Sequence, residues 1–318
     1  MTSSLETVVN HVRRGLERTI VGHAEAVDLL LVTLLCGGHA LVEGVPGLGK
    51  TLAVRTLARI LGLRFQRVQC TPDLMPADII GSNVFNMTSS TFALRQGPVF
   101  ADLLIVDEVN RMPPRTQAAL LEAMEERQVT VDGTTHRLSP EFAVFATENP
   151  VEFEGTYPLP EAELDRFLLK IRLDYPDRSR GEEERMLARH HEGFDMRALE
   201  SMDLEVLDAA EMVRARADVA AVRVEGPLFQ YIAAVARRSR DWPSIALGAS
   251  PRGSVHLMQA SKALAALDGR AYLLPDDVKR AAPAVLRHRV VLKAEAELEG
   301  VTPDQVIADL LAAVEVPK

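Results

Sequence analysis

A glycine-rich segment, Gly44-Val45-Pro46-Gly47-Leu48-Gly49-Lys50-Thr51, has the residue types and spacing of a phosphate-binding loop. Its glycines allow a tight turn in which successive backbone N–H groups point inward at phosphate oxygens. The helix expected after it would direct its positive N-terminus to the same place. Lys50 would reach the β- and γ-phosphates of a nucleotide, and the Thr51 hydroxyl would be a ligand of Mg²⁺. The segment therefore predicts a site for a nucleoside triphosphate with magnesium.

Two adjacent carboxylates, Asp107 and Glu108, follow the continuous apolar run 103–106. Such a run is typical of a parallel strand covered on both faces, and ligands bind beyond the carboxyl ends of such strands. Asp107 would then hold Mg²⁺ through water, and Glu108 would act as general base on the attacking water. Acidic residues also end many strands simply as solvated groups, but the phosphate loop upstream favours the catalytic interpretation.

Three further polar residues could act on the same phosphate. Asn149 follows another apolar run and could orient the water or touch the γ-phosphate, although an asparagine before Pro150 also suits a turn. Arg166 could neutralise charge in the transition state, in trans if a neighbouring subunit supplies it, or could only form a salt bridge to Asp165 or a nearby acid. Arg252 begins an expected helix and could reach back across the cleft to the γ-phosphate, or could be an ordinary exposed arginine.

The elements that must position these residues are short strands separated by helices. Strands are expected at 39–43, 64–70, 103–106, 143–146 and 168–173, and helices at 24–35 and 50–61. This alternation predicts a mostly parallel sheet with right-handed crossovers. Two β-hairpins are expected as inserts. One spans 128–138 around Asp132-Gly133, a preferred turn pair, and a weaker one spans 83–95 around Thr88-Ser89-Ser90.

Composition divides the 318-residue chain into an α/β part and a part rich in Ala, Leu, Arg and Glu. We predict an α/β nucleotide-binding domain at 1–176 and an all-helical domain at 177–318, with the boundary in a turn-rich stretch. The net charge of −9 argues mildly against broad nucleic-acid binding. Two cysteines form no disulfide framework, no run is long enough to span a membrane, and residues 1–6 lack the features of a signal peptide. These features favour a cytoplasmic location.

In this order and with these spacings, the motifs resemble those of an AAA+ ATPase, and more narrowly the chain resembles the MoxR family. The resemblance covers residues of about 20–289. Its most specific motif is Tyr157-Pro158-Leu159-Pro160-Glu161-Ala162-Glu163-Leu164-Asp165-Arg166-Phe167. The other matching segments are residues 43–51, 69–78, 107–111 and 125–133. One small departure is Glu148, where many relatives carry glutamine before the asparagine.

The resemblance implies an AAA+ module, with an α/β nucleotide domain followed by a helical lid. The hairpin at 83–95 would be the helix-2 insert, and the one at 128–138 the insert before the sensor strand. The implied catalytic residues are Glu108, Asn149 as sensor 1, Arg166 as arginine finger and Arg252 as sensor 2. The implied nucleotide contacts, including residues near the adenine, are Val21, Gly22, Gly44, Pro46, Gly47, Leu48, Gly49, Lys50, Thr51 and Leu52; the metal ligands are Thr51 and Asp107.

The resemblance also implies a ring, usually a hexamer, with ATP and Mg²⁺ at each subunit boundary. MoxR-like proteins are thought to act as chaperones that mature or assemble protein complexes, often with a partner that has a von Willebrand factor A domain. Three alternatives remain open at this point. The chain could be a magnesium-chelatase-like motor, a nucleic-acid motor, or a nucleotide-controlled scaffold with little turnover. The absence of a Lys or Arg pair at the tip of the first hairpin argues against tracking on DNA.

Overall fold

The computed structural model describes residues 4–88, 90–150, 155–195, 199 and 202–317. A five-stranded sheet lies in its first half, with the strand order β2-β5-β8-β1-β9 and every neighbouring pair parallel. The strands are β1 (Ala40–Glu43), β2 (Phe65–Gln69), β5 (Leu103–Asp107), β8 (Ala143–Glu148) and β9 (Leu169–Arg172). The parallel sheet predicted from the apolar runs is confirmed.

Alternate residues of the central strands pack into two separate cores. In β5, Leu103 and Ile105 join a cluster on one face, and Leu104 and Val106 join a second cluster on the other face. This follows from the two-residue repeat of a strand. Helices α1 (Ser4–Glu17), α2 (Ala24–Leu35) and α3 (Lys50–Ile60) contribute to the first cluster, and α4 (Pro76–Ile80) and α5 (Pro114–Glu126) to the second.

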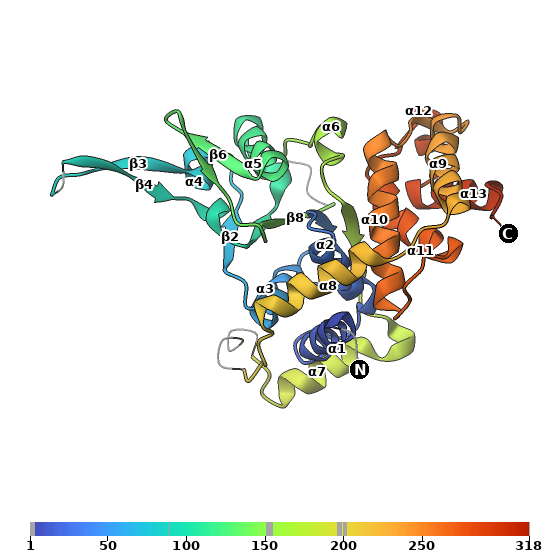
Figure 1. Ribbon diagram of the computed structural model, residues 1–318, viewed down its shortest axis with the longest axis horizontal. Coiled ribbons are helices and arrows are strands. Elements are labelled where there is room, and N and C mark those ends of the chain that lie inside the picture. The colour runs from blue at the N-terminus through green and yellow to red at the C-terminus, as the bar shows by residue number, and fades with distance from the viewer. Residues whose placement is uncertain (1–3, 89, 151–154, 196–198, 200–201, 318) are drawn as a thin grey trace.

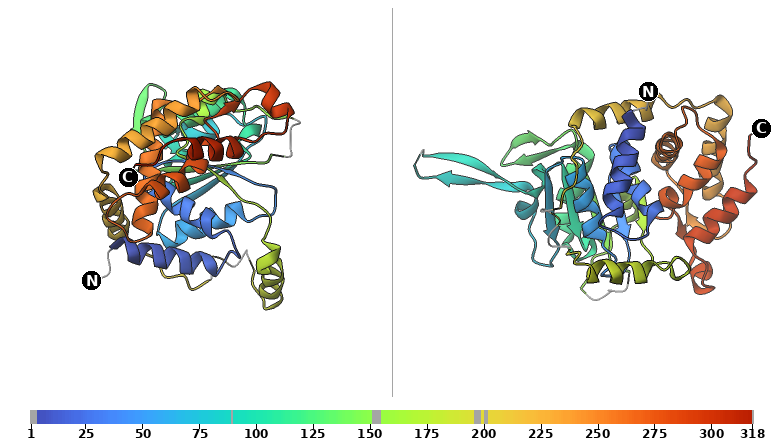
Figure 2. Two further views of the ribbon diagram at one scale, coloured as in Figure 1. Left: turned by 90° about the vertical axis from the view of Figure 1, so that its right-hand side faces the viewer. Right: turned by 90° about the horizontal axis from the view of Figure 1, so that it is seen from below.

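Both predicted hairpins are present. The first consists of β3 (Gly81–Asn86) and β4 (Thr91–Gln96), and it extends far from the body of the molecule (Figures 1 and 2). Ser89, in its expected turn, lies outside the described residues. The second consists of β6 (Gln128–Val131) and β7 (Thr134–Arg137). Its turn residues Asp132 and Gly133 have φ angles of 48° and 81°, as the Asp-Gly pair predicts.

The second half is largely helical, and its C-terminal part forms a lid that packs beside the sheet domain (Figure 1). Its helices are α7 (Glu182–His191), α8 (Ala209–Ala221), α9 (Gly226–Arg240), α10 (Pro251–Leu267), α11 (Pro275–Leu286), α12 (Ala294–Leu298) and α13 (Pro303–Ala313). Short elements complete the described chain: η1 (Pro98–Phe100), η2 (Val109–Arg111), α6 (Glu161–Leu164), η3 (Arg178–Arg180) and a ribbon of β10 (Ile245–Leu247) and β11 (Val291–Leu292). This ribbon differs from the all-helical expectation, since strands of two or three residues show no alternating pattern in a sequence.

Helix α8 follows the expected boundary at residue 176 in sequence but packs against α1 and α2 of the first half. The division at 176–177 therefore stays a prediction. Among the residues that the structure describes, no helix is both long enough and apolar enough to cross a membrane.

A buried histidine at the start of β1 makes stability sensitive to pH. The ring of His39 lies within hydrogen-bond distance of the Met124 carbonyl (3.2 Å) and accepts the Val144 N–H at Nδ1 (2.9 Å), which requires the neutral Nε2–H tautomer. Burial, together with the positive charge of Arg127, lowers the pKa of His39 to about 4. The unfolded chain takes up this proton below about pH 6.5, whereas the folded chain resists it until about pH 4.

We therefore expect His39 alone to lower the free energy of unfolding by about 2 kcal/mol between pH 7 and pH 5. Urea titrations at both pH values measure this. The His39→Asn variant keeps an acceptor for the Val144 N–H and removes the titration, so its stability should fall less over the same interval. An equal fall in the variant and the wild type would contradict the assignment.

Candidate active site

The glycine-rich loop joins the carboxyl end of β1 to the start of α3, so its backbone lies at the positive end of a helix. Gly47 and Gly49 have φ angles of 90° and 79°, which favour glycine over residues with a side chain. A Cβ atom added at either position would meet no atom within 4 Å. Both glycines therefore leave open space in front of the loop backbone, which is what close approach of a phosphate requires.

Lys50 lies folded over its own loop. Its ammonium group donates hydrogen bonds to the carbonyl oxygens of Gly44 and Val45. Partial burial lowers the pKa of Lys50, while Asp107, Glu108 and Glu43 act in the opposite direction. A cation in contact with the loop and surrounded by acidic side chains is well placed to bind a phosphate group.

Asp107 lies at the end of β5, directly beside Thr51 at the start of α3. The Thr51 hydroxyl is 3.3 Å from both carboxylate oxygens of Asp107, and the Thr147 hydroxyl is 3.3 Å from one of them. Arg67 donates to the same carboxylate at 2.6 Å. The hydroxyl and the carboxylate together offer the hard oxygen ligands that Mg²⁺ prefers, so these residues fit a magnesium ion.

Glu108 has an unusual backbone conformation, with φ 59° and ψ 54°. A positive φ is uncommon for a residue other than glycine and is often retained at functional sites. Its backbone N–H donates to the Thr147 hydroxyl at 2.9 Å, and its carboxylate contacts Arg111 at 3.3 Å. Thr147 thereby joins the backbone of Glu108 to the carboxylate of Asp107. The strand end thus presents two carboxylates at the edge of the sheet where the loop lies.

Asn149 follows β8 at the same edge and is buried, with 6% of its surface exposed. The preceding residue is Glu148, where many members of the resembling family carry glutamine. Its carboxylate lies 3.5 Å from the Lys170 ammonium group. Burial raises the pKa of Glu148, and Lys170 acts against this shift. The structure therefore brings Lys50, Thr51, Asp107, Glu108 and Asn149 to one edge of the sheet.

The two arginines lie elsewhere. Arg166 and Arg252 both bind the carboxylate of Glu125, at 2.7 Å and 2.6 Å. With these residues, His39 lines a small cavity of about 160 Å³. His39 precedes the first residue of β1, whereas the glycine-rich loop follows its last residue. The arginines are therefore at the amino edge of the sheet, about 13 Å along β1 from the loop edge.

This placement changes the expectation for Arg252. From the sequence, Arg252 could reach back across the cleft to the γ-phosphate or could be an ordinary exposed arginine at the start of a helix. Helix α10 instead begins next to α5 and the segment that carries Arg166, with Ser250 as its N-cap. The structure brings Arg252 together with Arg166 and not with Lys50, because α10 begins beside Glu125 and Asp165.

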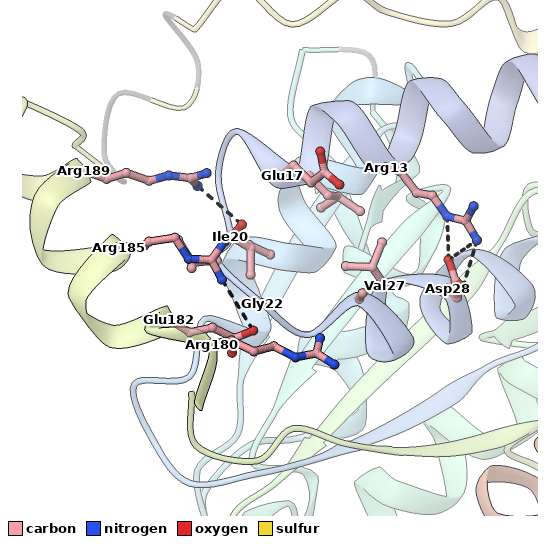
Figure 3. Close-up of a pocket in the computed structure, with 13 residues that line it drawn as sticks. Arg13, Glu17, Ile20, Gly22, Val27, Asp28, Arg180, Glu182, Arg185 and Arg189 are labelled. Atoms are coloured by element: carbon pink, nitrogen blue, oxygen red, sulfur yellow. Dashed lines mark hydrogen bonds and ion pairs between the residues drawn. The ribbon is translucent and has the colours of Figure 1, made fainter. Parts of the chain in front are cut away.

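Val21 and Gly22 border a cavity of about 650 Å³ between the segment that joins α1 to α2 and helix α7 (Figure 3). Arg189 points to the backbone of Ile20, and Arg13 pairs with Asp28 across the cavity wall. The described loop residues 44–52 are not among those that line it. The structure therefore does not bring Val21 and Gly22 into one cavity with the phosphate loop.

Arg289 couples the lid to the segment that carries Arg166. Its side chain is 1% exposed and binds the Asp165 carboxylate at 2.7 Å. It also donates to the carbonyl oxygens of Asp165 and Phe167 at 2.9 Å and 2.6 Å. Ser250, the residue that caps α10, donates to the same Asp165 carboxylate at 2.9 Å. Arg166 and Arg252 thus lie next to one hydrogen-bonded unit, which consists of Asp165, Ser250 and Arg289.

We expect the Arg289→Met variant to lose about 3 kcal/mol of unfolding free energy, because it leaves Asp165 and several carbonyl groups without their buried partner. Urea denaturation measures this loss. Adding Asp165→Asn to the variant should recover part of it, since the unpaired charge is then removed. A loss below about 1 kcal/mol would show that the buried pair does not hold the lid in place.

Comparison with known proteins agrees with this geometry. Residues 39–169 match the ATPase family associated with various cellular activities (AAA), and residues 237–310 match the AAA lid domain. Chaperone MoxR1 of Mycobacterium tuberculosis is 41% identical over 95% of this chain and 80% of its own length. Protein MoxR of Methylorubrum extorquens is 32% identical over 95% of this chain and 92% of its own length. The chain belongs to the MoxR family of AAA+ ATPases.

A solved structure supports the same assignment for the whole fold. A protein of Cytophaga hutchinsonii, provisionally described as an ATPase, superimposes with a TM-score of 0.88 and 38% identity. The match covers 99% of this MoxR-family chain and 96% of that one. The AAA+ module with its helical lid is thereby confirmed, and the magnesium-chelatase-like or helicase-like alternatives are not favoured.

Sequence reasoning missed three residues of the site: Arg67, Glu125 and Thr147. Thr147 lies two residues before Asn149, and Glu125 lies in one of the motifs that carry the family resemblance. Neither position showed by itself which side chains it would contact. The contact of Arg67 with Asp107 follows from the pairing of β2 with β5, where Gln69 lies opposite Asp107.

Proposed function

We propose that this MoxR-family protein hydrolyses ATP with Mg²⁺ at the boundaries between subunits of a ring, and that it uses the reaction to remodel or assemble protein clients. The observation that carries the proposal is the separation of two half-sites. Lys50, Thr51, Asp107 and Glu108 lie at one edge of the sheet, and Arg166 and Arg252 lie at the other. A complete site then needs the carboxyl edge of the sheet of one subunit, where the phosphate loop lies, and the amino edge of the next subunit, where the two arginines lie.

In this proposal each side chain at the loop edge has one role. Lys50 exchanges its loop carbonyls for the β- and γ-phosphates. Thr51 and Asp107 would hold magnesium, which would supply positive charge beside the phosphates. Glu108 takes the proton of the attacking water, and Asn149 orients that water. The remaining predicted loop contacts, Gly44, Pro46, Gly47, Leu48, Gly49 and Leu52, would position the triphosphate. Val21 and Gly22 line the separate cavity beside α7, so their contact with the base stays a prediction.

From the neighbouring subunit, Arg166 and Arg252 would approach the γ-phosphate and stabilise the charge of the transition state. Both lie on the hydrogen-bonded unit that Asp165, Ser250 and Arg289 build. When hydrolysis removes the γ-phosphate, Arg166 and Arg252 would lose their contact with it together. The lid and the segment that carries Arg166 would therefore respond as one unit. The result is a ligand-dependent change in the angle between neighbouring subunits.

The client would be a protein, and the hairpin of β3 and β4, which projects from the body of the molecule, would contact it (Figure 1). Its two strands carry one charged residue, Arg95, so it lacks the cationic tip expected for tracking on nucleic acid. A partner with a von Willebrand factor A domain, a hexameric ring and a cytoplasmic location complete the proposal; they rest on the family resemblance and on composition.

The test is ATPase activity of the purified protein with Mg²⁺ over a range of protein concentrations, with sizing by light scattering at each. We expect turnover per subunit to rise steeply over the concentration range in which the ring forms. Turnover that is constant from monomer to ring would place the whole site within one chain and would contradict the proposal.

A further inference from the structure

Glu125 is the acidic side chain that joins the two arginines of the trans half-site. It lies in the last turn of α5, and its carboxylate accepts one hydrogen bond at each oxygen. Oε2 accepts from Nε of Arg166 at 2.7 Å, and Oε1 accepts from a terminal nitrogen of Arg252 at 2.6 Å. The three residues come from α5, from the segment before β9 and from α10. One carboxylate thus ties together the sheet domain and the lid.

The carboxylate also offsets a charge conflict. Two guanidinium groups that share one ligand repel each other. Glu125 carries the only negative charge among the described residues that line their small cavity. Its two histidines are neutral at pH 7, since burial lowers the pKa of His256 to about 3 and that of His39 to about 4. The two arginines accordingly lower the pKa of Glu125, Arg252 having the larger effect.

The geometry leaves donors for a second anion. Each arginine uses one nitrogen for Glu125, and a guanidinium carries five N–H groups on three nitrogens. Arg166 contacts Glu125 through Nε. Among the residues that the structure describes, its planar terminal pair of nitrogens binds no other carboxylate, so this pair can bind a phosphate in bidentate fashion. The side chains of Arg166 and Arg252 are 29% and 41% exposed, so a ligand from a neighbouring subunit can approach them.

We propose that Glu125 is a positioning residue for ATP hydrolysis: it holds Arg166 and Arg252 side by side as one preformed receptor for the γ-phosphate bound by the adjacent subunit. This inference rests on the proposed function, since it assumes that the arginines act in trans. Preorganised donors need no rearrangement when charge develops on the phosphate, so Glu125 accelerates the reaction without touching the nucleotide.

The Glu125→Gln variant tests this role. An amide of the same size can accept from one arginine, but its NH₂ group faces the other and the negative charge is lost. We expect kcat to fall about tenfold or more in the assembled ring, with binding of ATP by the loop unchanged. The matched control is Glu126→Gln, which removes the same charge from the adjacent, exposed position of α5 and should keep wild-type turnover.

A mixing experiment separates positioning from a structural defect. Lys50→Ala subunits bind no triphosphate productively but carry an intact Glu125 with its two arginines. Mixed rings of Glu125→Gln and Lys50→Ala subunits should regain activity, because the loop of one variant then meets the intact arginine pair of the other. A subunit that is merely misfolded gains nothing from such a neighbour. In the Arg166→Ala background, Glu125→Gln should have a smaller effect than in the wild type.

Three outcomes would overturn the inference while the proposed function stands: wild-type turnover in Glu125→Gln rings, a loss that Lys50→Ala subunits do not restore, or a rise in kcat, which would make Glu125 a competitor of the phosphate. Failure of the proposed function has a different signature. In that case the wild-type protein itself shows no turnover that depends on assembly.

Discussion

The Glu108→Gln variant should bind ATP as tightly as the wild type and hydrolyse it about 10²- to 10⁴-fold more slowly. Glutamine has the shape of glutamate but cannot accept the proton of the attacking water. The phosphate and magnesium ligands Lys50, Thr51 and Asp107 stay in place, because the contacts of Asp107 with Thr51 and Thr147 do not involve the Glu108 side chain. Phosphate release and binding of a fluorescent ATP analogue measure the two properties separately.

The control for Glu108→Gln is Glu122→Gln, which removes a carboxylate from an exposed position of α5 and should hydrolyse ATP at the wild-type rate. Weak nucleotide binding in the Glu108→Gln variant would indicate that the variant is misfolded, and its slow hydrolysis could then not be assigned to loss of the general base. Hydrolysis at more than about a tenth of the wild-type rate, with full binding, would exclude Glu108 as the general base.

Arg166→Ala should lower the ATPase rate of the assembled ring by about 10³- to 10⁵-fold, the range typical of arginine fingers in phosphoryl transfer. Binding of ATP to the dilute subunit should be unchanged, because Arg166 lies at the opposite edge of the sheet from the loop. Steady-state turnover above the assembly concentration, beside nucleotide binding below it, measures both effects.

Arg237→Ala is the matched control for Arg166→Ala, since it removes an exposed arginine from the lid helix α9. It should leave turnover and assembly unchanged. If Arg166→Ala weakened ATP binding in the isolated subunit as much as it slowed the ring, Arg166 would have to act within its own chain.

The loop edge of the site could be predicted because its chemistry lies in consecutive residues. Lys50 and Thr51 follow their glycines directly, and Asp107 and Glu108 directly follow a buried strand. Two such segments on parallel strands must meet at one edge of the sheet, so their contact follows from topology. The distances of 3.3 Å between Thr51 and Asp107 agree with that expectation.

The arginine edge could not be predicted in the same way. Glu125, Arg166 and Arg252 are separated by 41 and 86 residues, and their contact depends on how the lid docks on the sheet domain. Their residue types alone were compatible with ordinary ion pairs or exposed helix ends. The docking is fixed by tertiary contacts such as Arg289 with Asp165, which leave no periodic pattern in the sequence. For that reason the contact of Arg252 with Glu125 could not be predicted.

The most direct test of hydrolysis between subunits is the activity of rings assembled from Lys50→Ala and Arg166→Ala subunits. Each variant alone lacks one half of every site, so each should be nearly inactive. A complete site forms where the phosphate loop of an Arg166→Ala subunit meets the intact arginines of a neighbouring Lys50→Ala subunit. We expect mixtures to recover a substantial fraction of wild-type turnover, greatest near equal proportions. Mixtures that stay as inactive as the separate variants, although sizing shows mixed rings, would contradict hydrolysis between subunits.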